Sequence, residues 1–549
     1  MFTLYIALID SYLDFVVMNI FYTLGKKRGE SLLPDRKEKY MAHTNSLVIH
    51  WSLAMETCKE CSRLQQRIDI SLTITEMYSW LLDSYVLDYY VDKHWQKLPP
   101  SWQNTFKDVD PQELSSLINN QTNELRSKRP WPLSLLTLRY LLVKLPLSRK
   151  QVAESFQAHL VSHCHGKNCH EHRTEIKVPS VLAPIAKVNE TSGEHLISKV
   201  DKVLTRHVKP KKQYEINSMA KVTAQAAEHC DVKLIVDVGS GLGHLSRMLA
   251  YKYGLQVCCI EAQGNLLEQA RILDNDTEKY LSKYLSAEEM KKLCRPVHIN
   301  AVIDSQFTAL SLMKELRNAY GIGENDLKFG IIGLHPCGDL APILLKLFTD
   351  CPDAVFINVV GCCYMKISTN IEGTPKFMGY PLSTFVSKRP HMLSFEAREI
   401  ACHAIETYRD RLHAGDYENL KIHCFRALLE KILVKHWPHL RHSVVKSIKH
   451  YSGLNFRDYC EIATARLGVK IPSEDFFSEE TCLNLSEWKK VVTFYTLRLM
   501  LAPLVETIIL LDRLLFLQEL EIGSALIPLF DPKISPRNHI LIALKHFKF

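Results

Sequence analysis

Apolar residues recur along this chain in two patterns, and the change from one to the other divides it. In residues 71–160 and 366–520 they recur at helical spacing, whereas in residues 207–365 short apolar runs alternate with helical segments. Short apolar runs separated by helices predict a parallel sheet that is covered on both faces. We therefore expect an α/β core, a helical N-terminal domain and a large helical insertion.

The apolar runs also place the individual strands. The predicted strands are 234–238, 255–260, 297–302, 327–334, 354–360, 526–530 and 539–544. The last two lie in a C-terminal segment, 521–549. They predict a β-hairpin at the end of the Rossmann-like sheet, with a final strand that runs opposite to the parallel strands. Helices are expected at 71–95, 115–125, 131–142, 152–160, 191–206, 265–273, 276–293, 395–412, 417–436, 456–467 and 486–517. Residues 1–70 stay an unassigned extension, and 161–206 are a linker with one helix.

The first strand runs directly into a glycine-rich loop. Its glycines, Gly239, Gly241 and Gly243, are two residues apart, whereas a dinucleotide fingerprint places its third glycine three residues after the second. With Asp237 they form D-x-G-x-G-x-G, which resembles motif I of class I S-adenosylmethionine-dependent methyltransferases. A nicotinamide or flavin site and a fortuitous turn are the alternatives. The residues expected to hold S-adenosyl-L-methionine here are Asp237, Gly239, Ser240, Gly241, Gly243 and His244.

Two further acids are candidates for the rest of that cofactor. Glu261 ends the second strand, 18 residues after Gly243, where an acid is expected to bind ribose hydroxyls. Asp304 follows the third strand. We interpret it as a contact to adenine or as a helix N-cap.

Ligands bind at the carboxyl ends of parallel strands, so residues after the fourth and fifth strands are expected to face the methyl acceptor. His335 is a candidate general base, with Asp339 close enough in sequence to orient it; alternatively both stabilise the loop. Cys337 with Cys362 or Cys363 is similar to the two cysteines of some RNA cytosine-C5 methyltransferases. A metal held by His335 and these three cysteines is the weaker alternative, and no metal is predicted.

Six motifs along the chain belong together. They are DVGSGLGHLSR (237–247), GLHPCGDL (333–340), GCCYMK (361–366), YPLS (380–383), LAPLVETIILLDRL (501–514) and SPRN (535–538). Together they resemble the methyltransferase-like protein 25 family, most closely its 25B branch, from about residue 71 to residue 549. The resemblance implies methyl transfer, with RNA as the leading acceptor class and protein second.

The atom that accepts the methyl group stays open. Adenine-N6 methyltransferases usually carry Asn/Asp-Pro-Pro-Tyr/Phe or Asn-Leu-Pro-Tyr after the fourth strand, and this chain has His335-Pro336-Cys337 there. The competing interpretation is a methyltransferase-like interaction module with weak catalysis or none. Asp237 and Glu261 favour the enzyme, because an inactive module need not keep acids for the cofactor.

Composition adds little to this picture. A net charge of +8, from 68 basic and 60 acidic residues among 549, is compatible with an RNA partner but does not require one. Sixteen cysteines without a secretory signal indicate a reducing, intracellular compartment, either cytoplasm or nucleus. Segments 1–24 and 497–517 are apolar, but charged residues interrupt both, so membrane spans are not favoured.

Two polar segments allow two interpretations each. Residues 163–172 are dense enough in cysteine and histidine to hold zinc, but their spacing matches no established zinc finger. The alternative is a linker that binds no metal. Residues 209–215 form a basic run before the helix that precedes the first strand. They are either a solvated turn or a lid that contacts RNA phosphates.

Overall fold

The computed structural model describes most of the chain beyond residue 58. The described residues are 59–118, 130–152, 157–161, 173–177, 200–291, 293–321, 327–373, 377–390, 392–446 and 453–545, with Pro375 and Ile448. The chain divides into two compact units, residues 1–59 with 165–168 and residues 60–164 with 169–549. Apart from Lys59, every described residue belongs to the second unit.

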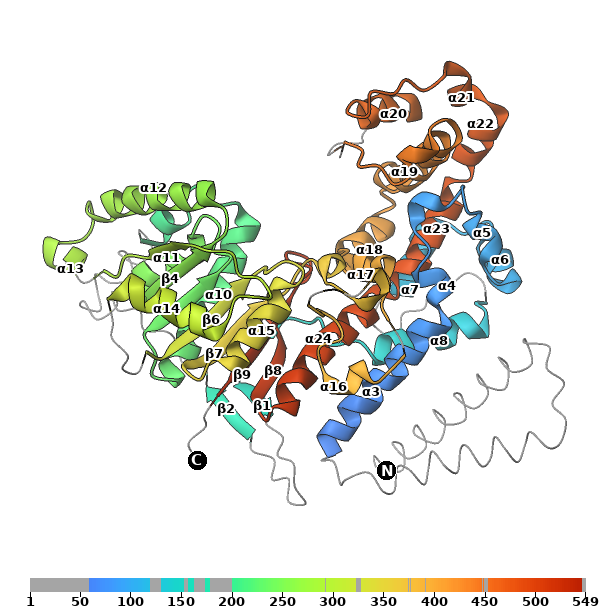
Figure 1. Cartoon of the computed structure of the whole chain (residues 1–549). Helices are drawn as coiled ribbons and strands as arrows, with labels where there is room; N and C mark the ends of the chain where they lie inside the picture. Colours follow the sequence, from blue (N-terminus) through green and yellow to red (C-terminus); the bar gives the residue numbers. More distant parts are fainter. Residues whose placement is uncertain are drawn as a thin grey trace. The chain divides into compact units, whose positions relative to one another are not determined.

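In the described residues nine strands form one sheet, in the order β2-β1-β8-β9-β7-β6-β3-β4-β5 (Figure 1). Their bounds are β1 Gln157–Val161, β2 Arg173–Lys177, β3 Leu234–Val238, β4 Gln256–Glu261, β5 Val297–Asn300, β6 Phe329–Leu334, β7 Ala354–Val360, β8 Gly523–Pro528 and β9 His539–Leu544. Strands β3 to β7 pair in parallel, whereas β9 is antiparallel to both β7 and β8. The predicted Rossmann-like sheet with a reversed final hairpin is therefore confirmed.

Helices cover both faces of this sheet. One face packs on α10 (Pro210–His229), α11 (His244–Arg247), the π-helical turn η3 (Met248–Lys252) and α12 (Gly264–Leu281). The other packs on α14 (Ala309–Tyr320) and α15 (Leu340–Asp350). Along β4 the faces alternate, since Cys259 joins the first cluster and Cys258 and Ile260 join the second. This two-sided burial explains why the strands are continuous apolar runs.

The helices described before β1 and after β7 enclose hydrophobic cores of their own. They are α3 Lys59–Met77, α4 Ser79–Leu82, η1 Val86–Asp88, α5 His94–Lys97, α6 Pro100–Phe106, α7 Pro111–Ile118, α8 Leu133–Lys144, α16 Thr384–Ser387, α17 Phe395–Ile400, α18 Ile405–Ala414, α19 Tyr417–His436, α20 Phe456–Thr464, α21 Ser473–Phe477, α22 Glu479–Ser486, α23 Trp488–Leu499 and α24 Ala502–Glu519. One buried cluster runs from Ile68 to Leu142 and from Tyr364 to Leu515. The N-terminal helices and most of those after β7 therefore pack around a common core, whereas α20, α21 and part of α19 enclose a smaller one.

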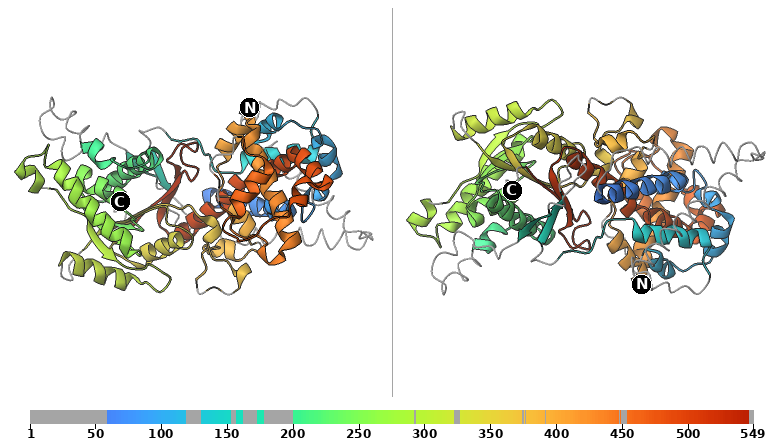
Figure 2. Two further views of the ribbon diagram at one scale, coloured as in Figure 1. Left: turned by 90° about the horizontal axis from the view of Figure 1, so that it is seen from above. Right: turned by 90° about the horizontal axis from the view of Figure 1, so that it is seen from below.

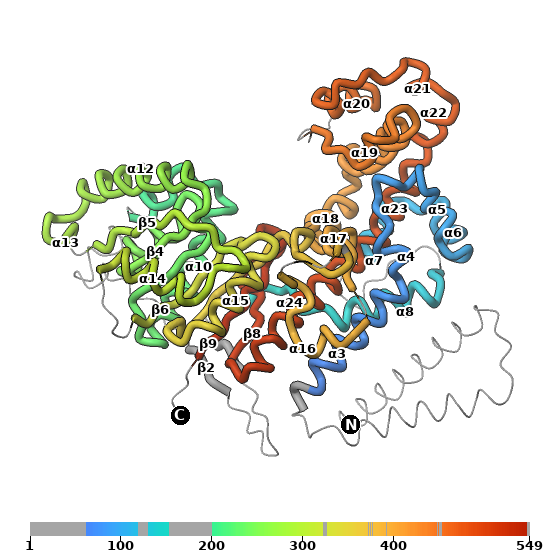
Figure 3. Tube along the Cα trace, viewed as in Figure 1, coloured from blue at the N-terminus to red at the C-terminus, as the bar shows by residue number. Residues whose placement is uncertain are grey.

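Helix α24 connects this helical core to the sheet. It contacts α17 and α16 within the core and lies along β8, as Figure 2 shows from two further directions. The trace then turns back through β8 and β9, and β9 enters the sheet beside β7 (Figure 3). Because β9 pairs with β7, this strand joins the C-terminal hairpin to the parallel strands that carry the glycine loop.

Several predicted elements match and others do not. Strands 234–238, 354–360 and 539–544 and helix 417–436 have the predicted bounds. The helix predicted over 152–160 is wrong at its end, because residues 157–161 are strand β1. That strand pairs with β2 and, through Val161, with β8. The local sequence gives no sign of such pairing, because it depends on residues elsewhere in the chain.

Two long predicted helices are broken into shorter ones. Segment 71–95 is divided among α3, α4, η1 and α5, because its aromatic side chains pack on separate partners: Tyr78 stacks on Trp102, and Tyr89 packs against Phe494. Segment 486–517 breaks between α23 and α24, where Pro503 stands in the first turn of α24 and cannot continue a helix from α23.

Among the described helices, none is both long enough and apolar enough to cross a bilayer. In α24, buried Asp512 accepts hydrogen bonds from the backbone N–H groups of Leu382 (2.7 Å) and Ser383 (2.9 Å). The charged residues of segment 497–517 therefore serve packing between elements. Segments 1–24 and 163–172 lie outside the described residues.

Candidate functional site

The loop after β3 has the backbone that its glycines predict. Gly239, Gly241 and Gly243 have φ angles of +70°, +57° and +69°, a region that side chains with a Cβ avoid. The N–H of Gly239 donates to the carbonyl of Ile260 at the end of β4 (2.8 Å), and that of Gly243 donates back to Ser240 (2.9 Å). A Cβ added to Gly241 would meet no atom within 4 Å, so the centre of the loop faces open space.

Glu261 joins the loop to the end of β4. Its Oε2 accepts a hydrogen bond from the N–H of Gly241 and its Oε1 accepts one from the N–H of Gln263, both at 2.9 Å. The carboxylate is nearly buried, with 8% of the residue exposed. Each carboxylate oxygen keeps a further lone pair, so Glu261 can accept hydrogen bonds from a ligand while it holds the loop.

Asp237 lies beneath the loop. Its Oδ2 accepts a hydrogen bond from the hydroxyl of Ser246 (2.6 Å), and only 2% of the residue is exposed. Burial raises the pKa of this carboxyl to about 6, against the lowering effects of Ser246 and Lys212. A buried carboxylate with few partners suits a cationic ligand group, which would stabilise its charge.

A buried ion-pair network supports the loop from behind. Arg247 Nη1 donates to Asp274 Oδ1 (2.9 Å), and His298 Nε2 lies 2.6 Å from Asp274 Oδ2. Arg247 Nη2 also donates to the carbonyl of Leu242 in the loop (2.7 Å). A Cβ on Gly243 would come within 3.3 Å of the Arg247 guanidinium, so a larger residue here would press on this ion pair. No local sequence pattern predicted this network.

His244 and Asp304 flank the loop differently. His244 Nδ1 accepts from Arg247 Nη2 (3.0 Å), and burial together with Arg247 lowers the pKa of His244 to about 3, so the ring is neutral. Asp304 is exposed and accepts from the N–H of Gln306 (2.9 Å). It does not cap a helix, because the N-cap of α14 is Thr308. The predicted N-cap alternative for Asp304 is therefore wrong.

His335 follows β6 with an unusual backbone, φ +66°. Its Nε2 lies 3.2 Å from Oε2 of Glu215, a buried residue of α10 whose Oε1 accepts from the hydroxyl of Ser535 (2.6 Å). The His335 and Ser535 contacts hold the pKa of Glu215 below its usual range, although burial acts in the opposite direction. The orienting carboxylate is thus Glu215, which lies 120 positions earlier in the chain and which no local pattern identified.

Asp339 has another role than the predicted one. Its Oδ1 accepts from the N–H of Ser368 (2.7 Å), and its Oδ2 accepts from the Ser368 hydroxyl. It therefore joins the loop after β6 to the loop after β7. The prediction that Asp339 orients His335 is wrong, and its alternative, a residue that stabilises the loop, describes Asp339 in this structure.

The three cysteines predicted near the acceptor meet at one point. Cys337 Sγ lies 3.4 Å from Cys362 Sγ and 3.3 Å from Cys363 Sγ, and the last two are 3.5 Å apart. All three are free thiols. Hydrogen bonds from the neighbouring thiols, first of all Cys362, lower the pKa of Cys337, which is the exposed member, while the same contact raises that of Cys362.

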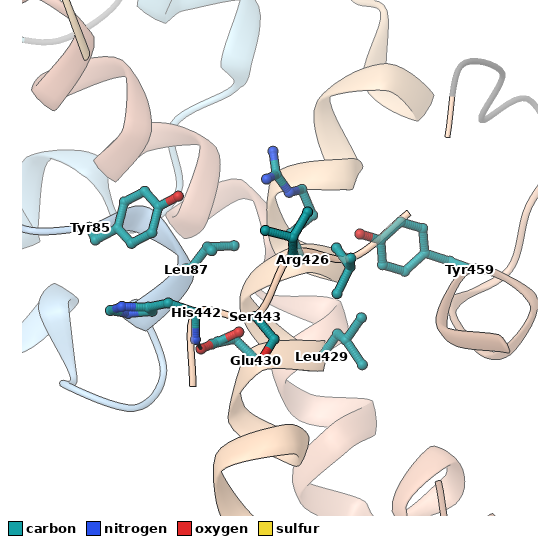
Figure 4. A pocket seen from close by; sticks show the side chains of 10 residues that line it. Tyr85, Leu87, Arg426, Leu429, Glu430, His442, Ser443 and Tyr459 are labelled. Atoms are coloured by element: carbon teal, nitrogen blue, oxygen red, sulfur yellow. Dashed lines mark hydrogen bonds between the residues drawn. The ribbon is translucent and has the colours of Figure 1, made fainter. Parts of the chain in front are cut away.

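A separate pocket of about 190 Å³ lies among the helices (Figure 4). Arg426, Glu430 and His442 are among its lining residues. Two of these charged residues have partners nearby: His442 Nε2 lies 2.8 Å from Asp88, and Glu430 accepts from the N–H of His442 (2.6 Å). None of its lining residues comes from the loops of the sheet, so we place the candidate site at the glycine loop.

Comparisons with known proteins agree with this choice. Residues 211–370 match a family model described as a methyltransferase domain. The chain is similar to probable methyltransferase-like protein 25 of mouse, with 24% identity over 458 residues, and of human, with 26% identity over 459 residues. These matches cover 61% of this chain and 75% and 74% of the two relatives.

Among solved structures, the crystal structure of the methyltransferase domain of bacterial CtHen1-CN is 14% identical, covers 26% of this chain and 65% of that chain, and has a TM-score of 0.17. The predicted resemblance to the methyltransferase-like protein 25 family is confirmed by the curated relatives. The 25B branch stays a prediction.

Proposed function

We propose that the methyltransferase domain of this chain transfers a methyl group from S-adenosyl-L-methionine, and that residues 237–243 bind this donor. One observation carries the proposal: the loop holds three glycines at positive φ around open space, and Glu261 is bonded to its central N–H. The donor supplies an electrophilic methyl group on a sulfonium. The protein has to hold it, exclude water and place an acceptor opposite the methyl group.

The loop residues fit that donor. The hydroxyl of Ser240 is buried and has no hydrogen-bond partner in the structure, so it offers a free polar atom to a ligand. Asp237 supplies negative charge for the ammonium end, Glu261 supplies acceptors for ribose hydroxyls, and Asp304 lies after β5 for the adenine end. Gly239 and Gly243 allow the backbone to approach the ligand closely, and His244 begins the helix behind the loop.

The acceptor is proposed to lie at the ends of β6 and β7. These strands are parallel to β3, so His335, Cys337, Asp339, Cys362 and Cys363 follow strands that end at the same edge as the glycine loop. His335 is our candidate for the group that accepts the proton of the nucleophile, because the Glu215 carboxylate can stabilise the imidazolium that forms. Asp339 acts indirectly, since it holds the two loops together.

RNA is the acceptor class that we propose, ahead of protein. Lys211 and Lys212 lie exposed in the first turn of α10, and Lys212 is close enough to lower the pKa of both Asp237 and His244. Basic side chains beside the donor loop can contact phosphates. To test the acceptor, extracts of cells that lack the protein are incubated with purified protein and labelled donor, after removal of either RNA or protein. Label in protein-depleted extract supports RNA, and label only in RNA-depleted extract refutes it.

Donor binding is tested by calorimetry with S-adenosyl-L-methionine. The wild type is expected to bind, and Gly241→Arg is expected to fill the open space and abolish binding. Gly468→Arg is the matched control, because Gly468 also has a positive φ (+67°) and open space around it but lies in the helical part. If the wild type does not bind the donor, the chain is an interaction module. If the control loses binding equally, backbone strain explains the Gly241 result.

A further inference from the structure

The three thiols of Cys337, Cys362 and Cys363, hereafter the thiol cluster, come from two separate loops. Cys337 follows β6, and Cys362 and Cys363 follow β7. Their sulfurs are 3.3–3.5 Å apart, far longer than a disulfide bond of about 2.05 Å. Three sulfurs at tetrahedral positions 2.3 Å from one zinc ion would be separated by about 3.8 Å. The cluster therefore needs shifts of only about 0.5 Å to hold a metal ion.

Burial of apolar side chains does not account for this arrangement. Cysteine is often buried as a small apolar residue, as Cys258, Cys259 and Cys460 are here. In the thiol cluster, by contrast, Cys337 is exposed and the other two are half-buried. A ligand or solvent molecule can therefore reach the cluster from outside the protein.

The two loops are held together around the cluster. A Cβ on Gly338, next to Cys337, would come within 2.6 Å of the backbone carbonyl of Lys366, so glycine allows the loops to touch. The Asp339 carboxylate binds both the N–H and the hydroxyl of Ser368. Fixed ligand positions of this kind lower the cost of assembling a metal site.

Buried cations from the helical core hold the second loop from the other side. A Cβ on Gly361 would lie 2.5 Å from a guanidinium nitrogen of Arg513, which comes from α24. The guanidinium of Arg398, from α17, donates to the carbonyl of Ile367. Three thiolates and one divalent ion carry a net charge of −1, and the nearby Arg513 offsets that charge.

We propose that the thiol cluster binds one zinc ion through its three thiolates and leaves the fourth coordination position open. Among the described residues, no further histidine, cysteine or acid joins this group. His335 Nε2 faces Glu215 instead. Thiolate ligands select zinc over magnesium or calcium, and three protein ligands with an open position are typical of zinc sites that bind a substrate or water.

Metal binding does not depend on the proposed function, but the use of the open position by the methyl acceptor does. The thiol cluster follows strands that are parallel to β3, so it lies at the same edge of the sheet as the glycine loop. A zinc ion there could bind the nucleophilic atom of the acceptor and favour its deprotonated form.

Metal content is measured first, on the full chain purified with a thiol reductant and without chelator. We expect about one zinc ion per chain by mass spectrometry, and at least a tenfold lower content in Cys337→Ser and Cys363→Ser. Cys482→Ser is the control, because Cys482 is an exposed free thiol outside the cluster. Absence of zinc in wild-type protein supplied with zinc overturns the proposal. So does iron or copper in its place, or full zinc content in both variants.

Cobalt substitution tests the geometry without relying on variants that could fold poorly. Co(II) bound to the wild type is expected to give a thiolate-to-metal charge-transfer band and the intense visible bands of a tetrahedral ion. Addition of a small thiol should shift those visible bands, because it enters the open position. Unchanged bands would show a closed four-ligand site, and a loss of two titratable thiols without metal would show a disulfide; each result overturns the proposal.

The two proposals fail separately. Gly241→Arg should keep its zinc and lose binding of S-adenosyl-L-methionine, whereas Cys363→Ser should lose its zinc and keep donor binding in calorimetry. Zinc binding without donor binding would refute the proposed function alone. Donor binding without zinc would refute the metal site alone.

Discussion

Asp237 gives the sharpest test of the donor site, because stability and binding are expected to change in opposite directions. Its carboxyl is 2% exposed, accepts one hydrogen bond from Ser246, and has a pKa raised to about 6, chiefly by burial. In the Asp237→Asn variant the amide oxygen can still accept the bond from Ser246, while the buried charge is removed. We expect a more stable protein that binds S-adenosyl-L-methionine more weakly.

The magnitude follows from the pKa shift. The pKa rises from 3.8 to about 6, and each pKa unit corresponds to 1.36 kcal/mol, so ionisation of Asp237 costs the folded state about 3 kcal/mol above pH 6. The folded state holds the proton more tightly than the unfolded state. Stability therefore falls as the pH rises from about 4 to about 6, and the full cost is present at neutral pH. Below pH 4 both states are protonated and the cost disappears.

Thermal unfolding of wild type and Asp237→Asn without cofactor, at pH 7.5 and at pH 4, measures this effect. At pH 7.5 the variant should gain about 1–3 kcal/mol, which corresponds to roughly 1 °C in Tm per kcal/mol, because the entropy of unfolding grows with the size of the unit that unfolds. The gain should vanish at pH 4. Calorimetry at pH 7.5 should show at least a tenfold loss of donor affinity, about 1.4 kcal/mol, because the ammonium loses its counter-charge.

Asp350→Asn serves as the control, since Asp350 is exposed at the end of α15 and the change should leave both quantities within experimental scatter. A variant that is less stable than wild type at pH 7.5 would show that the Asp237 carboxylate is stabilised in the folded protein, and the argument from burial would then be refuted. Unchanged donor affinity would remove Asp237 from the proposed binding site.

Three further changes test the support of the site. Asp274→Asn leaves the buried Arg247 guanidinium without its ion-pair partner and should lower the free energy of unfolding in denaturant by about 3–5 kcal/mol. A much smaller loss would show that this ion pair contributes little to stability. Glu261→Gln places an amide N–H₂ against a backbone N–H of the loop and should lower donor affinity at least tenfold in calorimetry; equal affinity would exclude a role in ribose binding. Gly338→Ala should lower both Tm and zinc content, because its Cβ pushes the two cysteine loops apart; normal zinc content would show that the loops adjust.

The glycine loop was predictable because its chemistry is local. Asp237, the three glycines and Glu261 lie in two consecutive strand–loop segments, and alternating apolar runs fix which residues end each strand. The same local signal placed β3, β7 and β9 with their observed bounds. It failed for β1, whose conformation depends on pairing with β2 and β8 rather than on its own residues.

Partners distant in sequence were not predictable. Glu215 faces His335 across 120 positions, and the chain between them holds four strands, so no spacing rule connects the two. Nearness in sequence instead suggested Asp339, whose carboxylate binds Ser368. The Asp274 pair with Arg247 was missed for the same reason, because charged residues on two helices give no signal until the helices pack.

The sequence by itself determined the fold class, the backbone of the glycine loop and the residues that end each parallel strand, because periodicity and glycine backbone preferences act over a few residues. The tertiary structure alone decided what those ends face. Packing of α10 brought Glu215 to His335, α24 placed Arg513 behind Gly361, and adjacent β6 and β7 gathered three cysteines within 3.5 Å. Such contacts depend on the order of the strands in the sheet and on the helices packed against it, which no local pattern encodes.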